Sequence, residues 1–393
     1  MINNFCFWKN LLRKSEIITC VLKTENMKKI TILLFLLGTA FIGKSQSDNP
    51  FKFTIVKNLE ATNVKSQGNT GTCWSFSTSS FIESEVLRKT GKKVDLSEMF
   101  VVRKIYMEKA ILYLRYHGNA SFSQGALAHD LFYVLKKYGM MPEEAYDGKN
   151  NAVSHNHTEL EVALKLYLDS ILKKSSIEPH WKEGFETILD KYLGVCPAVF
   201  NYGGLNYNSI SFAATLGINP DEYSGFTSFT HHPFYKPFDV EIPDNYSHGY
   251  YMNVPMDQLI EIIYSSIDKG YTVEWDGDVS EPGFARKRGA AFLLKKGEII
   301  GDSLPVEEVP TQELRQATFD SHETTDDHLM HITGIAKDKN GKRYYITKNS
   351  WGDNSGINGY VYMSENYLKL KTISIYVNKN VVPPLINSFI DKP

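Results

Sequence analysis

The segment Gln67-Gly68-Asn69-Thr70-Gly71-Thr72-Cys73-Trp74-Ser75-Phe76 constrains this chain more than any other. A loop containing glycine opens into a long amphipathic stretch, so Cys73 is predicted to lie at the start of a helix. The unpaired N–H groups and the positive dipole end of a helix N-terminus lower the pKa of a thiol. The sequence therefore predicts a nucleophilic cysteine at a junction between a loop and a helix.

A nucleophilic thiol needs a base, a group that orients the base, and donors for the developing oxyanion. His328 and His331 are the candidate bases, because both precede Asn349 at the entry of a predicted strand. Strand alternation makes them point in opposite directions, and His331 is chosen as the base. Asn349 is predicted to orient its imidazole. Trp351 is predicted to cover that hydrogen bond from water.

The oxyanion donors are predicted to be the side-chain amide of Gln67 and the backbone N–H of Cys73. Taken alone, Gln67 reads equally well as a polar loop residue, and Asn349 as a turn residue before Gly352. Only the combination of these residues with Cys73 indicates one site.

Gln67, Cys73-Trp74, a distant histidine and Asn349-Ser350-Trp351-Gly352 together resemble the papain-like cysteine peptidases. Further features resemble the bleomycin hydrolase and aminopeptidase C branch. Asn69 and Thr70 stand where papain has an extra disulfide cysteine, and 258 residues separate Cys73 from His331. The runs 137–142, 227–233 and 326–331 also resemble that branch. The resemblance covers about residues 55–380.

The resemblance implies an α+β fold with a helical lobe that carries the cysteine and an antiparallel β lobe that carries the histidine and asparagine. It assigns Cys73 as nucleophile, His331 as base and acid, Asn349 as its orienting group and Gln67 as oxyanion donor. Trp351, Gly125 and Ala126 would bind substrate, the last two as the family's Gly-Gly strand, where alanine is a departure. No metal or cofactor is implied.

In relatives of this branch, a C-terminal arm places its terminal carboxylate in the cleft and binds the free amine of the substrate. Residues 381–393 form a shorter tail, which leaves aminopeptidase and endopeptidase specificity open and makes the ring-shaped hexamer of the branch uncertain. The 27 residues from Gln46 to Cys73 leave no room for a papain-type inhibitory prodomain.

The N-terminal region is predicted to be a targeting segment. Lys28-Lys29, the apolar run 30–42 and Gly43-Lys44-Ser45-Gln46 follow the pattern of a secretory signal over residues 27–46. Residues 1–26 are then an upstream mis-called start, and the alternative is an uncleaved anchor that begins at Met1. The thirteen residues of this run are too few to span a bilayer. An exported protein, periplasmic or extracellular and without a membrane anchor after cleavage, is expected.

Composition excludes one class of partner. The chain has 43 Lys and Arg and 45 Asp and Glu, of which seven and two lie in residues 1–46, so the mature part carries a net charge of −7. Such a balance argues against nucleic-acid binding. Of four cysteines only Cys73 and Cys196 lie beyond the signal, and Cys73 is expected to be a free thiol.

The periodicity predicts helices first and a sheet last. Residues 47–393 should form one peptidase, with a helical lobe over about 61–200 and a β-rich lobe over about 246–380. Residues 281–325 are polar and are predicted to form an exposed excursion.

The expected function is peptide hydrolysis through a thioester acyl-enzyme, most simply as an aminopeptidase. The alternatives are a broad endopeptidase, a catalytically silent peptide-binding protein on the same fold, and another Cys-His enzyme such as an amidase or transglutaminase. Peptides are the expected substrates, and self-association into a homo-oligomer is a further expectation.

Overall fold

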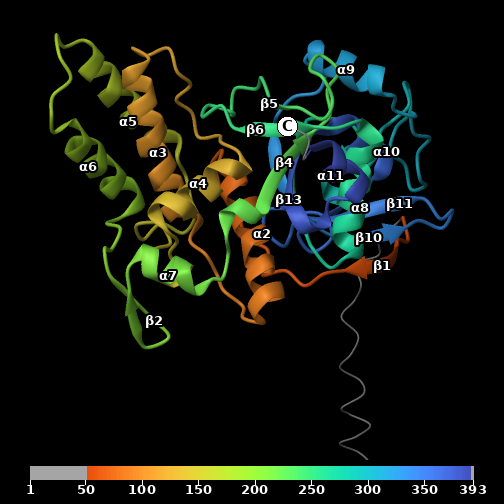
Figure 1. Ribbon diagram of the computed structural model, residues 1–393, viewed down its shortest axis with the longest axis horizontal. Helices are drawn as coiled ribbons and strands as arrows, with labels where there is room; N and C mark the ends of the chain where they lie inside the picture. The colour runs from red at the N-terminus through yellow and green to blue at the C-terminus, as the bar shows by residue number, and fades with distance from the viewer. Residues whose placement is uncertain (1–50, 391–393) are drawn as a thin grey trace, which may run out of the picture. The chain divides into compact units, whose positions relative to one another are not determined.

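The computed structural model describes residues 51–390, and the predicted signal and upstream start lie outside them. The first part of this region is mostly helical (Figure 1). Its helices are α2 (Cys73–Thr90), α3 (Glu98–Arg115), α4 (Ala128–Tyr138), α5 (Thr158–Leu172), α6 (Trp181–Leu193) and α7 (Ser209–Thr215). The later part carries α8 (Met256–Asp268), α9 (Gln312–Asp320), α10 (Glu365–Lys371) and α11 (Pro384–Ile390).

One large mixed sheet organises the second half of the chain. Its order is β5-β6-β4-β13-β7-β10-β11-β12-β9-β8, with β1 also paired to β10. The strands are β1 (Thr54–Asn58), β4 (Tyr223–Thr227), β5 (Pro237–Asp239), β6 (Tyr250–Asn253), β7 (Val273–Gly277), β8 (Phe284–Ala285), β9 (Ala290–Ala291), β10 (His328–Lys337), β11 (Arg343–Lys348), β12 (Tyr360–Ser364) and β13 (Thr372–Asn378). A separate hairpin joins β2 (Phe200–Tyr202) to β3 (Leu205–Tyr207).

Helix α2 lies between the helices α3 to α7 and the sheet (Figure 1) and packs on β10 and β7. Alternation along β10 divides the core into two layers. Leu329 joins the cluster that contains α2, whereas Met330 and Ile332 join the cluster that contains α8. The sheet therefore has α2 on one face and α8 on the other.

The helices come first and the sheet last, as the periodicity predicted. Helix α3 begins at Glu98, and its N-cap Ser97 accepts from the Phe100 N–H. Gly341 takes a positive φ of 81° in the turn before β11. The α+β fold class is confirmed, although two strand pairs, β4–β6 and β9–β12, are parallel.

Two boundary predictions are wrong. The sheet of the β-rich part already includes β4 from Tyr223, rather than starting near residue 246, because β4 pairs with β13. The region 281–325 is not simply an exposed excursion, because it contains β8, β9 and α9. The fully buried guanidinium of Arg315 on α9 donates to four backbone carbonyls.

The last described residues pack on the α8 face of the sheet. Val381 and Ile386 are buried in the cluster that contains α8. The Val381 carbonyl accepts hydrogen bonds from Ser265 of α8 and from Lys269, which follows α8. Phe389 stacks on Tyr235 with ring centroids 4.4 Å apart. Within residues 51–390, no helix has the length and apolar character needed to cross a membrane.

Candidate active site

Cys73 is the first residue of α2, as predicted, and is a free, buried thiol. The loop before it is held in place by Gln124, whose side-chain oxygen accepts from the Gly71 N–H at 2.7 Å. The Gln124 carbonyl accepts from the Trp74 indole at 2.9 Å. The loop and the extended segment around residue 124 therefore form one unit beside the thiol.

The histidine that Asn349 orients is His328, and the prediction of His331 is wrong. His328 Nε2 lies 2.8 Å from Asn349 Oδ1. Because the asparagine oxygen accepts, Nε2 carries the proton and Nδ1 keeps its lone pair. The thiol of Cys73 is hydrogen-bonded to the backbone of Leu329, the residue after His328. These contacts bring Cys73, His328 and Asn349 into one site.

His331 lies on the other side of β10, against α2. Its Nδ1 is 2.9 Å from Ser80 Oγ, which also accepts from Lys348 Nζ at 2.8 Å. The His331 side chain is fully buried, and no described residue bonds its Nε2. Alternation correctly predicted that the two histidines diverge, but it did not say which one meets Asn349. His331 is a packing residue between the helix and the sheet.

Trp351 covers the imidazole of His328. The two rings are stacked, with centroids 4.5 Å apart and planes inclined by 26°. The guanidinium of Arg286 lies 4.3 Å from the centroid of the Trp351 ring. Sequence reasoning missed Arg286, because the residue lies in a polar stretch without a motif. The stack fixes the imidazole plane and shields its bond to Asn349.

Gln67, the predicted oxyanion donor, lies in the loop before Cys73 and has one amide hydrogen free. Its Oε1 accepts from Ser350 Oγ at 2.6 Å, which leaves the amide nitrogen directed away from Ser350. That nitrogen donates one hydrogen to the Thr70 carbonyl at 2.7 Å. An amide carries two hydrogens, so one remains for a ligand. The backbone of Gln67 also donates to the Ser350 carbonyl, which ties the loop to the Asn349 segment.

Burial dominates the protonation of the site. It raises the pKa of the Cys73 thiol to about 12, against the hydrogen bond from Leu329 and with smaller contributions from the charges of Asp326, Asp244 and Asp276. Burial also lowers the pKa of His328 to about 4, against its bond to Asn349. Each charge alone is disfavoured. Proton transfer from the thiol to the imidazole creates both charges together, and their mutual attraction offsets part of the cost.

Gly125 and Ala126, which are predicted to bind substrate, differ in their exposure to solvent. Gly125 is partly exposed, whereas Ala126 is fully buried and offers no surface to a ligand in this structure. On the other side of the thiol loop, a groove of about 460 Å³ is open to solvent. Gln67, Gly71, Gln124, Arg286 and Trp351 are among the residues that line it. The groove therefore lies beside the loop that precedes Cys73, next to Gln67 and Trp351.

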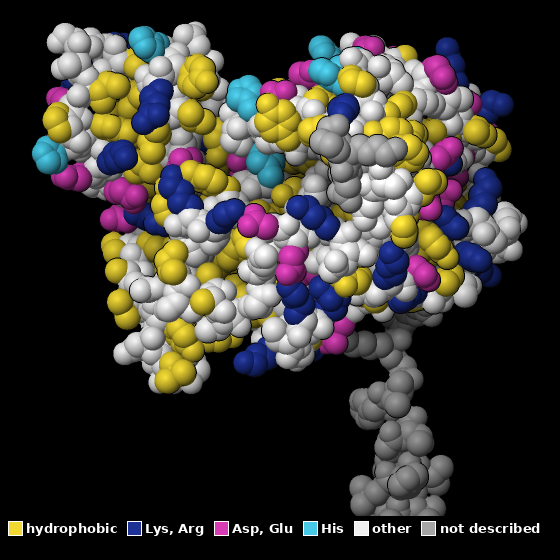
Figure 2. Space-filling model, in the orientation of Figure 1, with side chains coloured by type: hydrophobic (Ala, Val, Ile, Leu, Met, Phe, Trp, Pro, Cys, Tyr) yellow, Lys and Arg dark blue, Asp and Glu magenta, His cyan; other side chains and the backbone are white. Residues whose placement is uncertain are grey.

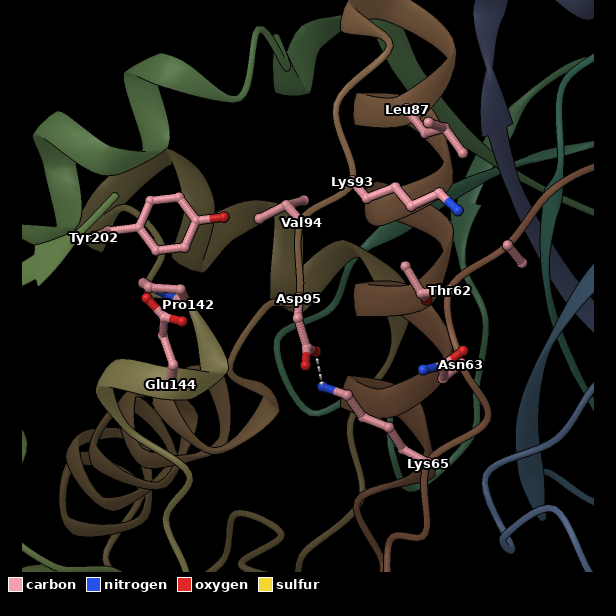
Figure 3. A pocket seen from close by; sticks show the side chains of 11 residues that line it. Thr62, Asn63, Lys65, Leu87, Lys93, Val94, Asp95, Pro142, Glu144 and Tyr202 are labelled. Carbon is pink, nitrogen blue, oxygen red and sulfur yellow. Dashed lines mark ion pairs between the residues drawn. The ribbon is translucent and has the colours of Figure 1, made fainter. Parts of the chain in front are cut away.

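A second cavity of about 340 Å³ is lined by Lys65, Lys93, Asp95 and Tyr202, among others (Figure 3). In Figure 3 the ammonium of Lys65 points to the carboxylate of Asp95, and the two form an ion pair of 2.5 Å. Neither Cys73 nor His328 lines this cavity, so it is separate from the candidate active site.

His231, His232 and Glu241 form a group with metal-ligand atoms within 4.8 Å of one another. Hydrogen bonds account for this arrangement. The two imidazole Nε2 atoms lie 3.0 and 2.7 Å from the Glu241 carboxylate. Gln316 donates to His231 Nδ1 at 3.0 Å, so His231 Nε2 carries a proton rather than a lone pair for a metal.

Comparison with known proteins agrees with this geometry. Residues 50–178 match the model of the papain family cysteine protease, and residues 213–393 match that of the peptidase C1-like family. Aminopeptidase G of Lactobacillus delbrueckii subsp. lactis is 24% identical over 363 residues, 82% of each chain. Aminopeptidase C of Listeria innocua is 23% identical over 401 residues, 89% of each chain.

A solved structure shows the same fold. The crystal structure of PepW from Lactobacillus rhamnosis HN001 matches with a TM-score of 0.70 at 18% identity, and the match covers 95% of both chains.

Proposed function

Because the chain belongs to the papain-like cysteine peptidases, in their peptidase C1-like branch, we propose that it is an aminopeptidase. It would remove N-terminal residues from peptides through a thioester intermediate. The aminopeptidases similar to it support this choice.

The proposed acylation uses His328 first as base and then as acid. Cys73 Sγ attacks the scissile carbonyl carbon while its proton passes to His328 Nδ1. The carbonyl oxygen becomes an oxyanion and accepts from the free Gln67 amide hydrogen and the Cys73 backbone N–H. Collapse breaks the C–N bond, and His328 gives its proton to the leaving amine. The acyl group remains on Sγ as a thioester.

Deacylation repeats the sequence with water. His328 takes a proton from the water as its oxygen attacks the thioester carbon, and the same donors bind the second oxyanion. The C–S bond then breaks, and the proton on His328 returns to sulfur. Asn349 holds the Nε2–H tautomer throughout, which keeps Nδ1 directed to the chemistry.

The contact that carries this proposal is the 2.8 Å bond between His328 Nε2 and Asn349 Oδ1. It gives a base with a defined tautomer next to a thiol at a helix N-terminus. A silent peptide-binding protein would have no need of that constellation.

The test is hydrolysis of two matched fluorogenic substrates, alanyl-aminomethylcoumarin and its N-acetyl form, with Cys73→Ala as the control. We expect cleavage of the free-amine substrate by the wild type and none by the variant. Cleavage of both substrates at similar rates would indicate an endopeptidase. Cleavage of neither under reducing conditions, with Cys73 accessible to iodoacetamide, would refute the peptidase assignment.

Export through the segment 27–46 and self-association are parts of the proposal that need their own measurements. Mass spectrometry of the mature N-terminus tests the first, and a start near residue 47 is expected. Sedimentation tests the second. The apolar side chains of Val199, Leu205 and Ile210, each more than half exposed, lie near β2 and α7, where Figure 2 shows hydrophobic groups.

A further inference from the structure

The connection between β5 and β6, residues 240–249, crosses from the sheet to the helical part of the molecule. Ser247 Oγ donates to Asp130 Oδ1 on α4 at 2.8 Å and lies 2.7 Å from His129 Nε2. The ring of Tyr246 lies 4.6 Å from the ammonium of Lys109 on α3. We call this connection the strap.

The strap has a fixed internal conformation. The buried side chain of Asn245 donates to the carbonyls of Val240 and Gly249 and accepts from the Gly249 N–H. These bonds join both ends of the strap through one side chain. The residue before Asn245 is therefore held in a defined position.

That residue is Asp244, and its carboxylate lies directly on Gly125. A Cβ added at Gly125 would overlap both carboxylate oxygens of Asp244. Gly125 belongs to the segment that Gln124 ties to the Cys73 loop. Because residue 125 is a glycine, the Asp244 carboxylate can lie beside the segment that is predicted to bind substrate.

No residue within 51–390 donates a hydrogen bond to the Asp244 carboxylate or forms an ion pair with it. Lys109 is the cation that faces it, but the Lys109 ammonium is used by the carbonyls of Ser123 and Gly125. Burial raises the pKa of Asp244. The charge of Lys109 lowers this pKa, and the charge of Asp130 raises it. A half-buried carboxylate without a donor is favourable only when a cation can reach it.

Two further carboxyl groups lie near Cys73. Asp276 is fully buried, and its carboxyl is hydrogen-bonded to that of Asp326. Asp244, Asp276 and Asp326 all act on the charge of Cys73. The space next to the nucleophile is therefore acidic.

We propose that Asp244 binds the α-ammonium group of the substrate's N-terminal residue and so restricts the enzyme to free N-termini. The inference rests on the proposed aminopeptidase function and names the group that enforces it. A residue whose carbonyl is next to Cys73 carries its ammonium on the Gly125 side. The strap fills the space beyond it, so a longer N-terminal extension does not fit.

The rival source of a carboxylate is the chain's own C-terminus, as in the arm of the relatives. The described residues of the C-terminal segment lie on the other face of the sheet. Its buried residues, Val381 and Ile386, contact the α8 side of the sheet, whereas Cys73 lies on the α2 side.

The test compares Asp244→Asn with the matched control Asp239→Asn. Asp239 is an acidic residue at the start of the same connection, and its carboxylate is bonded to His248 instead of facing Gly125. Gly125→Ala displaces the Asp244 carboxylate without changing it and serves as a second variant. A chain that ends at residue 390 tests the C-terminus. The readout is kcat/KM for alanyl-aminomethylcoumarin and for its acetylated form, with iodoacetamide labelling of Cys73 in each protein.

Asp244→Asn should lower kcat/KM for the free-amine substrate roughly 10- to 100-fold, mainly through KM, because a charged hydrogen bond is lost. Its activity on the acetylated substrate and its Cys73 labelling should stay within about three-fold. Gly125→Ala should reduce the preference in the same direction, and Asp239→Asn and the truncated chain should keep it.

Two results would overturn the inference while the peptidase assignment stands. One is an unchanged free-to-acetylated ratio in both Asp244→Asn and Gly125→Ala. The other is loss of the preference in the chain ending at residue 390. A wild type that cleaves neither substrate would instead overturn the proposed function, and the role of Asp244 with it.

Discussion

Replacing each of the two histidines of β10 in turn tests whether His328, as in the structure, or His331, as predicted from the sequence, is the catalytic base. His328→Ala removes the base next to Cys73. His331→Leu replaces a buried imidazole on the α2 side of the sheet with an apolar side chain of similar size. If Asn349 orients His328, only the first change should abolish catalysis.

The expected loss in His328→Ala follows from the pKa of the thiol. Burial raises that pKa to about 12. Without a base to take the proton, the thiolate fraction at neutral pH would be on the order of 10⁻⁵ to 10⁻⁴. General-base catalysis contributes about 10²–10⁴ in comparable enzymes. We therefore expect kcat/KM to fall by roughly 10²- to 10⁴-fold.

The expected effect of His331→Leu is on stability. The change loses the 2.9 Å contact with Ser80 but also removes a buried Nε2 without a partner. A hydrogen bond is worth about 1 kcal/mol, and an unsatisfied buried group costs a similar amount, so the free energy of unfolding should change by about 1 kcal/mol or less. Activity per folded molecule should stay within about three-fold.

The assay is kcat/KM on alanyl-aminomethylcoumarin, corrected for folded protein by circular dichroism and thermal unfolding. A His331→Leu enzyme that is folded but inactive, beside an active His328→Ala enzyme, would refute the assignment of the base.

Three other changes test further parts of the structure. Gln67→Ala should lower kcat about 10²–10³-fold with little change in KM, because an oxyanion donor acts mainly in the transition state; equal kcat values would exclude that role. Arg315→Met should destabilise the fold by about 3–5 kcal/mol in urea unfolding, because four buried carbonyls lose their donor, and an unchanged midpoint would contradict this. Burial raises the pKa of Asp276 to about 8, against its hydrogen bond with Asp326. A carboxyl whose folded-state pKa exceeds its unfolded value stabilises the fold fully below the unfolded pKa of about 4, and this contribution is lost as the pH rises to about 8. The melting temperature should therefore fall between about pH 4 and 8, and less steeply in Asp276→Asn; parallel curves would show that Asp276 is not responsible.

The active site illustrates which parts of a structure local sequence can predict. A thiol at a helix start depends on neighbours within a few residues, and the structure places Cys73 there. The hairpin before β11 and the Ser97 cap are local in the same sense. Boundaries of the β-rich part were less predictable, since pairing of β4 with β13 joins residues about 150 positions apart.

The sequence by itself determined the nucleophile, its loop, the segment that supplies the asparagine, and the divergence of His328 from His331. Only the tertiary structure decided which histidine meets Asn349, because alternation relates residues of one strand to each other but not to the helix or loop on either face. It also placed the carboxylate of Asp244 on Gly125. No local pattern encodes that contact, since the strap and the Cys73 loop meet only when the sheet and the helices pack together.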